Sequence, residues 1–434
     1  MNTPEIPPFV RFILGRLKKA GYKGYIVGGA VRDTCRGRPV KDWDVATSAF
    51  PEVIREIFKE QKQFTLKHDT VSLVSDGQTF EITTFRGEEG DIEGDLRRRD
   101  FTINAMAFDG ENGSIIDPCL GQRDLMKQIV RASGNPHARF REDPLRLLRA
   151  VRFAAETGFF IERDTLAAME DLSALLPSSA QERIRDELVR ILVSDRPSAS
   201  FNLMVRTGLL KEFLPELQEG RFKRQNRYHK HTILKHTLAT LDSIRPDPDL
   251  RLTALLHDVA KPRVRRKIGG EWRFFGHEKE STLLAEEIMG RLRFKGSVIS
   301  KVIFLIRHHL ILYDSNWSDG AVRRLIRKVG DPMIWDLFAL READLSTHTE
   351  CEQQMEMLTE LKNRVRAQVE SKSVVREKDL AVDGWTIMAE TRLPPGPGVG
   401  KVLKELHEKV LDQPELNNRE ALIALLRQIR MPDV

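Results

Sequence analysis

Two acidic residues, Asp42 and Asp44, stand two positions apart in a short stretch that follows a pair of glycines. On a strand, both carboxylates would project to the same face and could hold divalent cations side by side. The upstream glycines, Gly28 and Gly29, let the backbone approach a triphosphate, and a helix start after them would offer N–H groups to its oxygens. The pattern therefore predicts phosphoryl transfer, although an Asp-x-Asp pair alone is also typical of a solvated turn.

Polar side chains that can handle phosphate and sugar follow the predicted sheet. Arg98 and Arg99 precede an apolar segment, and arginine at a sheet edge can hold phosphate through two parallel hydrogen bonds. Asp100 and Asn104 could orient a ribose, or cap a local turn. Glu81, on a predicted strand, is a candidate third carboxylate for metal binding or base catalysis, or a charged residue on an exposed strand face.

Charged side chains recur at every third position in the segment EDPLRLLRAVR, at Asp143, Arg146, Arg149 and Arg152. This spacing places neighbours on one helix face, which is most often a solvated face. Asp143 offers an acceptor and Arg146 offers donors, which match the base edges of cytosine and adenine and leave unpaired groups against uracil and guanine. Because unpaired buried polar groups are costly, the pair predicts base selection without a template.

Alternating helix and strand patterns up to about residue 110 predict a small sheet that positions these residues. We expect an α+β fold, with a small mixed-sheet head followed by all-helical segments. The expected elements of the head are a helix at Pro8–Ala20, strands at Gly24–Val27 and Trp43–Ala46, a helix at Pro51–Lys59, and strands at Val71–Val74 and Thr79–Phe85.

Composition and charge limit the classes of protein that the chain can belong to. At 434 residues, it is long enough for two to four domains. Its 70 basic and 64 acidic residues give a net charge of +6, a mild excess that suits a polyanionic partner. Cys35, Cys119 and Cys351 are odd in number and far apart, which argues for a reducing compartment. Arg11 and Arg16 interrupt the N-terminal apolar stretch, and no run suits a membrane span, so we expect a cytoplasmic protein with no membrane partner.

Four segments carry a family resemblance: GGAVRD with DWD, RRDFTINAMA, DPCLGQRDL and EDPLRLLRAVRFA. Over about residues 24–160 they resemble the head and neck motifs of class II tRNA nucleotidyltransferases and bacterial poly(A) polymerases, in the DNA polymerase beta-like superfamily. The resemblance implies Mg²⁺ on Asp42 and Asp44, and addition of nucleotides to the 3′ end of tRNA. The candidate nucleotide-binding residues are Gly28, Gly29, Arg32, Asp33, Arg99, Asp100, Asn104, Asp143, Arg146, Arg149 and Arg152.

A short connection departs from the pattern of the complete CCA-adding relatives. Only eight residues, 87–94, separate the strand ending in TTFR from the segment DLRRRD. The connection resembles that of enzymes that add only two cytidines, since a longer mobile loop is a plausible lever for reshaping the pocket for adenine. A tolerated loop deletion is the other explanation. We predict CC addition from CTP; the alternatives are complete CCA addition from CTP and ATP, a poly(A) polymerase, and an HD-type phosphohydrolase with an inactive head.

Histidines and aspartates in the second half of the chain resemble the HD phosphohydrolase superfamily. Imidazoles and carboxylates are good ligands of transition metals. The resemblance implies a metal such as manganese or nickel, and hydrolysis of phosphoesters or cyclic phosphate ends; a metal-free domain that helps to hold tRNA is the alternative. The implied metal ligands are His236, His257, Asp258 and Asp344, with His277 and His308 as further ligands or acid–base groups.

The predicted organisation has four parts, with the oligomeric state left open. A basic run at Arg221–Tyr228 interleaves aromatic residues, which suits phosphate contact and base stacking. Leu403, Leu406 and Val410 have the spacing of a packed helix face near the C-terminus. The resemblance implies that the C-terminal part grips the tRNA elbow while the acceptor stem reaches the head. The parts are a nucleotidyltransferase head at 1–140, a helical neck at 141–220, an HD-type body at 221–372 and a tRNA-binding tail at 373–434.

Overall fold

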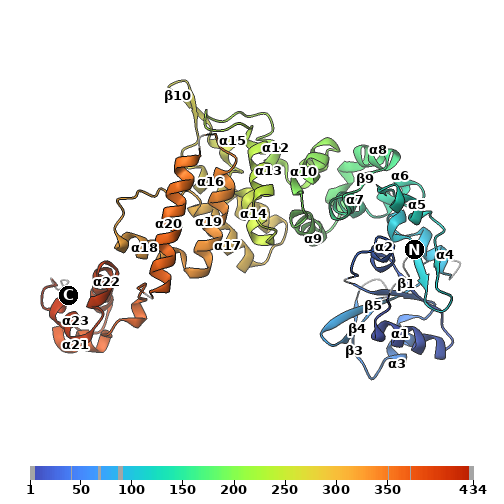
Figure 1. Ribbon diagram of the computed structural model, residues 1–434, viewed down its shortest axis with the longest axis horizontal. Coiled ribbons are helices and arrows are strands. Elements are labelled where there is room, and N and C mark those ends of the chain that lie inside the picture. The colour runs from blue at the N-terminus through green and yellow to red at the C-terminus, as the bar shows by residue number, and fades with distance from the viewer. Residues whose placement is uncertain are drawn as a thin grey trace. The chain divides into compact units, whose positions relative to one another are not determined.

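The computed structural model describes residues 5–40, 42–66, 70–86, 91–349, 351–371 and 373–429. The chain forms two compact units, which we call unit 1 (Met1–Gln218) and unit 2 (Glu219–Val434). Unit 1 holds a mixed sheet followed by helices, whereas the described part of unit 2 is helical apart from one short hairpin (Figure 1). The predicted α+β class is thereby confirmed. Among the described residues, no helix combines the length and apolar composition needed to cross a membrane.

A seven-stranded sheet with the order β3-β4-β5-β2-β1-β6-β7 forms the centre of the head. Strand β1 runs antiparallel to β2 and β6, and β2 runs parallel to β5. The strands are β1 (Gly24–Val27), β2 (Asp44–Thr47), β3 (Lys62–Leu66), β4 (Thr70–Ser75), β5 (Gln78–Thr84), β6 (Ala107–Asp109) and β7 (Ser114–Ile116). Strand β2 begins at Asp44, one residue after the predicted start at Trp43, so Asp42 precedes the strand and the two carboxylates do not project from one strand face. Strand β3 was not predicted.

Short helices complete the head and cover the sheet. Helix α1 (Pro8–Lys19) buries Val10, Ile13 and Leu17, which recur at the three-to-four-residue spacing of one helix face. Together with α3 (Pro51–Ile57) it packs against the sheet (Figure 1). The other short elements are α2 (Gly29–Cys35), α4 (Ile92–Arg97), a 3₁₀ turn at Thr102–Asn104, and α5 (Gly121–Met126).

The second half of unit 1 is a layer of helices, with one small parallel sheet of β8 (Ile129–Val130) and β9 (Phe160–Ile161). Helices α7 and α9 pack together, and α7 ends at Gly158, whose φ of 74° lies in the left-handed region that favours glycine. These helices are α6 (Pro136–Glu142), α7 (Leu145–Thr157), α8 (Arg163–Leu172), α9 (Gln181–Leu192), α10 (Pro197–Arg206), α11 (Leu209–Phe213) and α12 (Pro215–Gln218).

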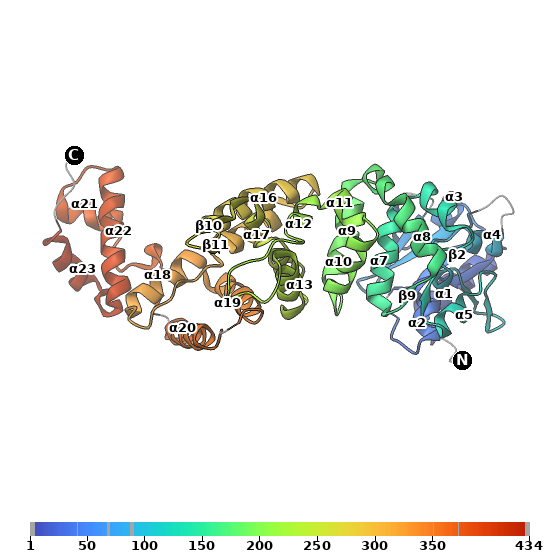
Figure 2. The same cartoon turned by 90° about the horizontal axis from the view of Figure 1, so that it is seen from above.

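Unit 2 contains a helical body and a C-terminal group of helices (Figure 2). The body has a hairpin of β10 (Arg266–Ile268) and β11 (Glu271–Arg273). Its helices are α13 (Ile233–Ser243), α14 (Pro248–Leu256), α15 (Lys261–Val264), α16 (His277–Arg291), α17 (Gly296–His308), α18 (Asp319–Val329), α19 (Asp331–Leu345) and α20 (Glu352–Glu370). The C-terminal helices α21 (Gly384–Thr391), α22 (Pro397–Asp412) and α23 (Arg419–Leu426) share a separate apolar cluster that includes Leu406 and Val410.

We predict that Leu406→Ala destabilises the C-terminal cluster by about 2–5 kcal/mol, because Leu406 is fully buried and its loss leaves a cavity. Hydrogen exchange of the α22 amides should measure the loss. Leu312→Ala is the matched control, since Leu312 is 84% exposed and its truncation should cost less than about 0.5 kcal/mol. Equal protection of α22 in both variants would contradict the assignment of Leu406 to this core.

Candidate active site and candidate metal centre

A cavity of about 1330 Å³ opens in unit 1 beside the sheet, α2, α7 and α9. Every residue that the sequence assigned to nucleotide or metal binding in the head and neck lines this one cavity. These residues are Gly28, Gly29, Arg32, Asp33, Asp42, Asp44, Arg99, Asp100, Asn104, Asp143, Arg146, Arg149 and Arg152. The structure therefore brings together side chains that are up to 124 positions apart in the sequence, from Gly28 to Arg152.

Three carboxylates, of Asp42, Asp44 and Glu81, meet on the sheet side of the cavity. Asp44 and Glu81 are direct neighbours across the parallel pair of β2 and β5. Burial, and then the charges of Glu81 and Asp42, raise the pKa of Asp44 to about 6 against the opposing effect of Arg99. Burial and the charge of Asp42 also raise the pKa of Glu81. Three carboxylates this close together concentrate negative charge and oxygen ligands, which fits a divalent cation.

Gly28 lies beside the carboxylate of Asp44 and the guanidinium of Arg99. Its φ of 70° and ψ of −129° are accessible to glycine and strained for other residues. A Cβ atom at this position would lie 3.2 Å from Nη1 of Arg99 and 3.6 Å from Oδ2 of Asp44. Arg99 is itself held by a salt bridge of 3.0 Å to the buried Asp95. Glycine therefore keeps the space between the guanidinium of Arg99 and the carboxylate of Asp44 open.

Arg32 is held in place by side chains from two elements. Its Nε and Nη2 donate to the two carboxylate oxygens of Asp33 at 2.9 and 3.0 Å, and its Nη1 donates to Oδ1 of Asn104 at 2.8 Å. Asn104 in turn donates to Asp100 at 3.4 Å. The guanidinium therefore faces the cavity in a fixed orientation, as phosphate recognition requires.

Arg149 and Arg152 continue this network into the helices. Arg149 donates to Oδ2 of Asp100 at 2.8 and 2.5 Å, and it pairs with Glu187 of α9 at 3.5 Å. Arg152 is buried and pairs with Glu187 at 2.5 Å. Burial opposes the charge on Arg149, but Asp100 and Glu187 outweigh it and raise the pKa of Arg149. Burial also opposes the charge on Asp100, and Arg149 outweighs it and lowers the pKa of that carboxyl.

Phe153 gathers three of the arginines around one aromatic ring. The guanidinium carbons of Arg32, Arg149 and Arg152 lie 5.6, 5.4 and 4.1 Å from its centroid. Each is within the range of a cation–π interaction. Sequence analysis did not identify Phe153, although it follows the arginine repeat directly.

Asp143 and Arg146, the predicted base-reading pair, each have a partner from the protein. Arg183 of α9 donates to both oxygens of Asp143, at 3.3 and 2.9 Å. Arg146 donates to Glu142 at 2.5 Å and to the carbonyl of Arg139 at 3.1 Å. Sequence analysis did not assign Arg183 and Glu187 to the site: Arg183 is half exposed and holds Asp143, whereas Glu187 is buried. Their i, i+4 spacing on α9 was the available signal.

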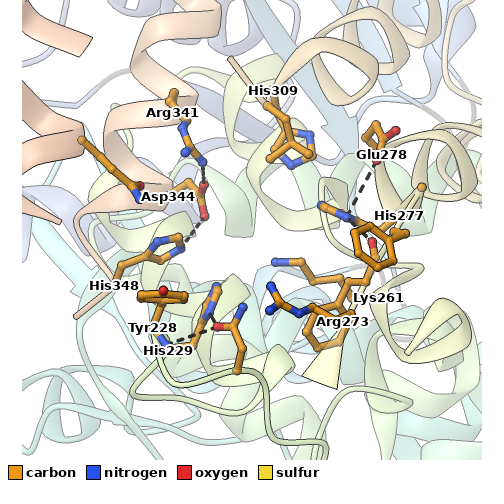
Figure 3. Close-up of a pocket in the computed structure, with 16 residues that line it drawn as sticks. Tyr228, His229, Lys261, Arg273, His277, Glu278, His309, Arg341, Asp344 and His348 are labelled. Atoms are coloured by element: carbon orange, nitrogen blue, oxygen red, sulfur yellow. Dashed lines mark hydrogen bonds and ion pairs between the residues drawn. The ribbon is translucent and has the colours of Figure 1, made fainter. Parts of the chain in front are cut away.

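Unit 2 holds a cluster of histidines and aspartates, part of which lines a cavity of about 450 Å³ (Figure 3). Asp258 lies at the centre of the cluster: its Oδ2 is 3.2 Å from Nε2 of His236 and 3.1 Å from Nε2 of His257, and its Oδ1 is 3.4 Å from Nε2 of His277. Oδ1 of Asp344 is 3.1 Å from Nε2 of His236. The four predicted ligands His236, His257, Asp258 and Asp344 therefore meet in space, together with His277.

The backbone of unit 2 orients the imidazoles. Nδ1 of His257 lies 2.8 Å from the carbonyl oxygen of Ala254, and Nδ1 of His277 lies 2.8 Å from that of Phe274. Each Nδ1 therefore donates a hydrogen bond, and each Nε2 keeps a lone pair. Nδ1 of His236 lies 2.7 Å from the hydroxyl of Thr347. The Nε2 atoms of all three, and both oxygens of Asp258, are buried; within the described chain they make ion-pair contacts with one another and with Lys261 but no contact with hydrogen-bond geometry. Such orphaned atoms fit a bound transition-metal ion, whose second shell fixes each histidine in this way.

The electrostatics of the cluster also favour a cation. Burial opposes the charge of His257, but Asp258 and Asp344 outweigh it and raise the pKa of that imidazole to about 10. Burial likewise opposes the charge of Asp258, and His257 and Lys261 outweigh it and lower its pKa well below the usual range. Negative charge from Asp258 and Asp344 therefore favours a positive charge within the cluster, which a bound metal ion would supply.

The structure changes the predicted ligand set in two ways. His309, and not His308, faces the cluster: it is buried, with Nε2 4.0 Å from Oδ1 of Asp258. Helix α17 ends at His308, whose ring packs on Phe304 instead, so the turn after the helix directs the next residue inward. His229 and His348, which sequence analysis missed, form a further group of possible ligands with His236.

The folded head, with clustered carboxylates beside an arginine-lined helix, defines a nucleotidyltransferase of the polymerase type. Three family models match the chain: "Poly A polymerase head domain" at residues 24–131, "RNA and SrmB- binding site of polymerase A" at 158–220, and "tRNA nucleotidyltransferase domain 2" at 283–426. The CCA-adding enzyme of Streptococcus gordonii is 30% identical over 434 residues, covering 96% of this chain and 96% of that enzyme. That of Levilactobacillus brevis is 30% identical over 442 residues, covering 98% of each.

Other relatives match over different lengths. The CCA-adding enzyme of Lactobacillus gasseri is 41% identical over 225 residues, which cover 49% of this chain and about half of that enzyme, 56%. The solved structure of the Bacillus stearothermophilus CCA-adding enzyme in complex with CTP has a TM-score of 0.73 at 26% identity, covering 98% of each chain. The chain belongs to the family of CCA-adding enzymes, the tRNA nucleotidyltransferases, which confirms the resemblance seen in its motifs.

We predict that Glu187→Gln destabilises unit 1 by about 3–5 kcal/mol, because it leaves Arg149 and Arg152 partly buried without their shared counter-charge. Hydrogen exchange of the α7 and α9 amides should report the change. Asp186→Asn, one position away on the same helix, removes a carboxylate whose side chain is 66% exposed and should cost less than about 1 kcal/mol. Similar exchange in both variants would contradict the structural role of Glu187.

Proposed function

We propose that unit 1 transfers nucleotides from CTP and ATP to the 3′ end of tRNA, without a template and with release of pyrophosphate. The observation that carries the proposal is the single cavity that combines three carboxylates, phosphate-binding arginines and the pair Asp143 and Arg146. Relatives that align over 96% and 98% of their own length are CCA-adding enzymes, which favours complete CCA addition.

Asp42 and Asp44 are the proposed magnesium ligands, with Glu81 as a further ligand or as the acceptor of the proton from the tRNA 3′-hydroxyl. When bound, magnesium supplies positive charge at the reacting phosphate and at the departing pyrophosphate. Arg32 and Arg99 then hold phosphate oxygens from opposite sides of Gly28 and Gly29. Positioning of this kind is most of what a protein contributes to phosphoryl transfer.

Asp143 and Arg146 are the proposed readers of the incoming base. The carboxylate accepts from the exocyclic amino group of cytosine or adenine, and the guanidinium donates to the neighbouring ring nitrogen. Uracil and guanine would place a donor against the arginine and an acceptor against the carboxylate. Selection then rests on the cost of leaving these groups unpaired.

A second candidate is the addition of CC alone, favoured by the short connection between β5 and α4. Residues 87–90 of this connection lie outside the described residues, so the observation is its length, from Thr84 at the end of β5 to Ile92 at the start of α4. A connection of this length offers little chain with which to reshape the base pocket after the second cytidine. The CC prediction therefore stands beside the complete reaction as an alternative outcome.

Incubation of tRNA lacking its 3′ end with labelled CTP and ATP separates the two candidates. Products three nucleotides longer, ending in adenosine, are expected for complete addition, and products that stop after two cytidines identify CC addition. Asp42→Asn should lower either rate by about two to three orders of magnitude or more, because it removes a metal ligand. Asp76→Asn, in the exposed β4–β5 turn, is the control. Undiminished transfer by Asp42→Asn would refute the proposed site.

We further propose that unit 2 hydrolyses phosphoesters or cyclic phosphate ends. The unpartnered Nε2 atoms and the oxygens of Asp258 support this second activity. A transition-metal ion such as manganese or nickel, held by His236, His257, Asp258 and Asp344, would supply Lewis-acid activation of the phosphate. Lys261, which lies 2.6 Å from Asp258 and lines the cavity, is placed to contact a phosphate oxygen.

His257→Ala should lower the rate of hydrolysis of a cyclic nucleotide, measured with manganese or nickel, by about a hundredfold or more, because it removes a metal ligand. A chelator should have the same effect on the unmodified protein. His308→Ala is the matched control, because His308 lies outside the cluster. The hydrolysis rate of this variant should stay within about twofold of that of the unmodified protein. Hydrolysis that survives His257→Ala and chelation ends this proposal.

A further inference from the structure

A basic hairpin adjoins the candidate metal centre of unit 2. The segment 261–273, which contains β10 and β11, has six basic residues and one acidic residue. The acidic residue, Glu271, lies 3.1 Å from Arg273 and 3.6 Å from Arg227. Among the described residues, Arg266 has no carboxylate partner and is exposed. Lys261 pairs with Asp258 and Arg263 pairs with Glu219, so the positive charge that has no carboxylate partner in the described part of the chain lies at residues 265–267.

The two strands sort this charge onto two faces. Arg266 is the direct cross-strand partner of Arg273, and Lys267 that of Trp272, so the first pair lies on one face and the second on the other. Like charges opposite each other destabilise a hairpin unless an anion lies between them. Arg273 also lines the cavity of the metal centre, on the same side as Lys261 (Figure 3). The face with Arg266 therefore leads into the site.

A second basic segment, 221–230, converges on the same cavity. It has five basic residues and no acidic one. The amino group of Lys223 donates to the carbonyl of Pro262 at 3.3 Å, and Tyr228 lines the cavity. Two segments about forty positions apart thus form one basic surface around the cavity mouth.

Exposed aromatic rings lie among these cations. Phe222 is 81% exposed and Phe275 is 74% exposed, although large aromatic rings are usually covered. Phe275 and Tyr228 both line the cavity. Cations that follow a phosphate backbone, with aromatic rings on which bases stack, are the two parts of a single-strand-binding surface.

We propose that the segments 221–230 and 263–275 bind single-stranded RNA and lead its 3′ end into the metal centre. The inference rests on the proposed hydrolytic activity of that centre and names its substrate class: the terminal phosphate or cyclic phosphate of an RNA strand, in preference to a free nucleotide. The surface extends beyond the cavity, so only a substrate with several phosphates contacts Arg266.

The experiment compares two substrates with the same reacting end, without nucleoside triphosphates and with manganese. One is cytidine 2′,3′-cyclic phosphate, and the other is an RNA strand of about ten nucleotides that ends in the same group. The full chain should prefer the strand, by kcat/KM, and the preference should fall as salt rises. Arg266→Glu should lower the preference by about tenfold. Lys267→Glu, the same charge reversal on the opposite face, should change it by less than about twofold.

Two results separate failure of the inference from failure of the hydrolase proposal. If both substrates are hydrolysed and the preference for the strand is the same in the unmodified protein and in Arg266→Glu, the proposed RNA-binding surface is wrong, while the hydrolase proposal stands. If neither substrate turns over, the hydrolase proposal fails. In that event, photo-crosslinking of a 4-thiouridine strand decides the surface: labelling of residues 222–228 and 266–275 that Arg266→Glu abolishes supports it, and labelling elsewhere alone overturns it.

Discussion

The buried ion pair between Asp100 and Arg149 is the interaction on which the rest of unit 1 depends. It joins the segment after α4 to α7, and Glu187 extends it to α9. Removing one member of such a pair leaves an uncompensated charge in a poorly solvated place, so the members must be kept or lost together. The network thereby holds the segment after α4 and the helices α7 and α9 together around the cavity, and many of the residues that line this cavity pair with one another.

Unit 2 shows the opposite arrangement of charge. Its central carboxylate, Asp258, is buried among imidazoles whose outer nitrogens are fixed by backbone carbonyls and whose inner nitrogens have no hydrogen-bond partner in the described chain. In unit 1 the protein completes its own network and leaves room for a polyanion. In unit 2 the inner atoms of the network are left without hydrogen-bond partners in the described chain, and the proposed metal ion would complete it.

Patterns within a short stretch of sequence predicted those helices and strands whose bounds depend on neighbouring residues. Helix α1 and strand β1 were expected within one residue of their observed bounds, because hydrophobic spacing sets both. The motif residues of the head meet in one cavity, as their resemblance implied. Sequence did not predict that His229 would reach His348, since nothing in local spacing reports contacts between residues 119 positions apart. It also misplaced His308 and His309, whose directions depend on where α17 ends.

The partners of Asp143 and Arg146 give the nucleotide-free enzyme an internal competitor. Arg183 occupies the carboxylate and Glu142 occupies the guanidinium, so a base read by the proposed pair would have to exchange two existing ion pairs for its own hydrogen bonds. A base that satisfies both groups recovers the lost interactions, whereas a base that satisfies only one leaves a deficit. In the proposed site these resting contacts would weaken the binding of every nucleotide by the same free energy, and selection among bases would come from the hydrogen bonds that each base recovers.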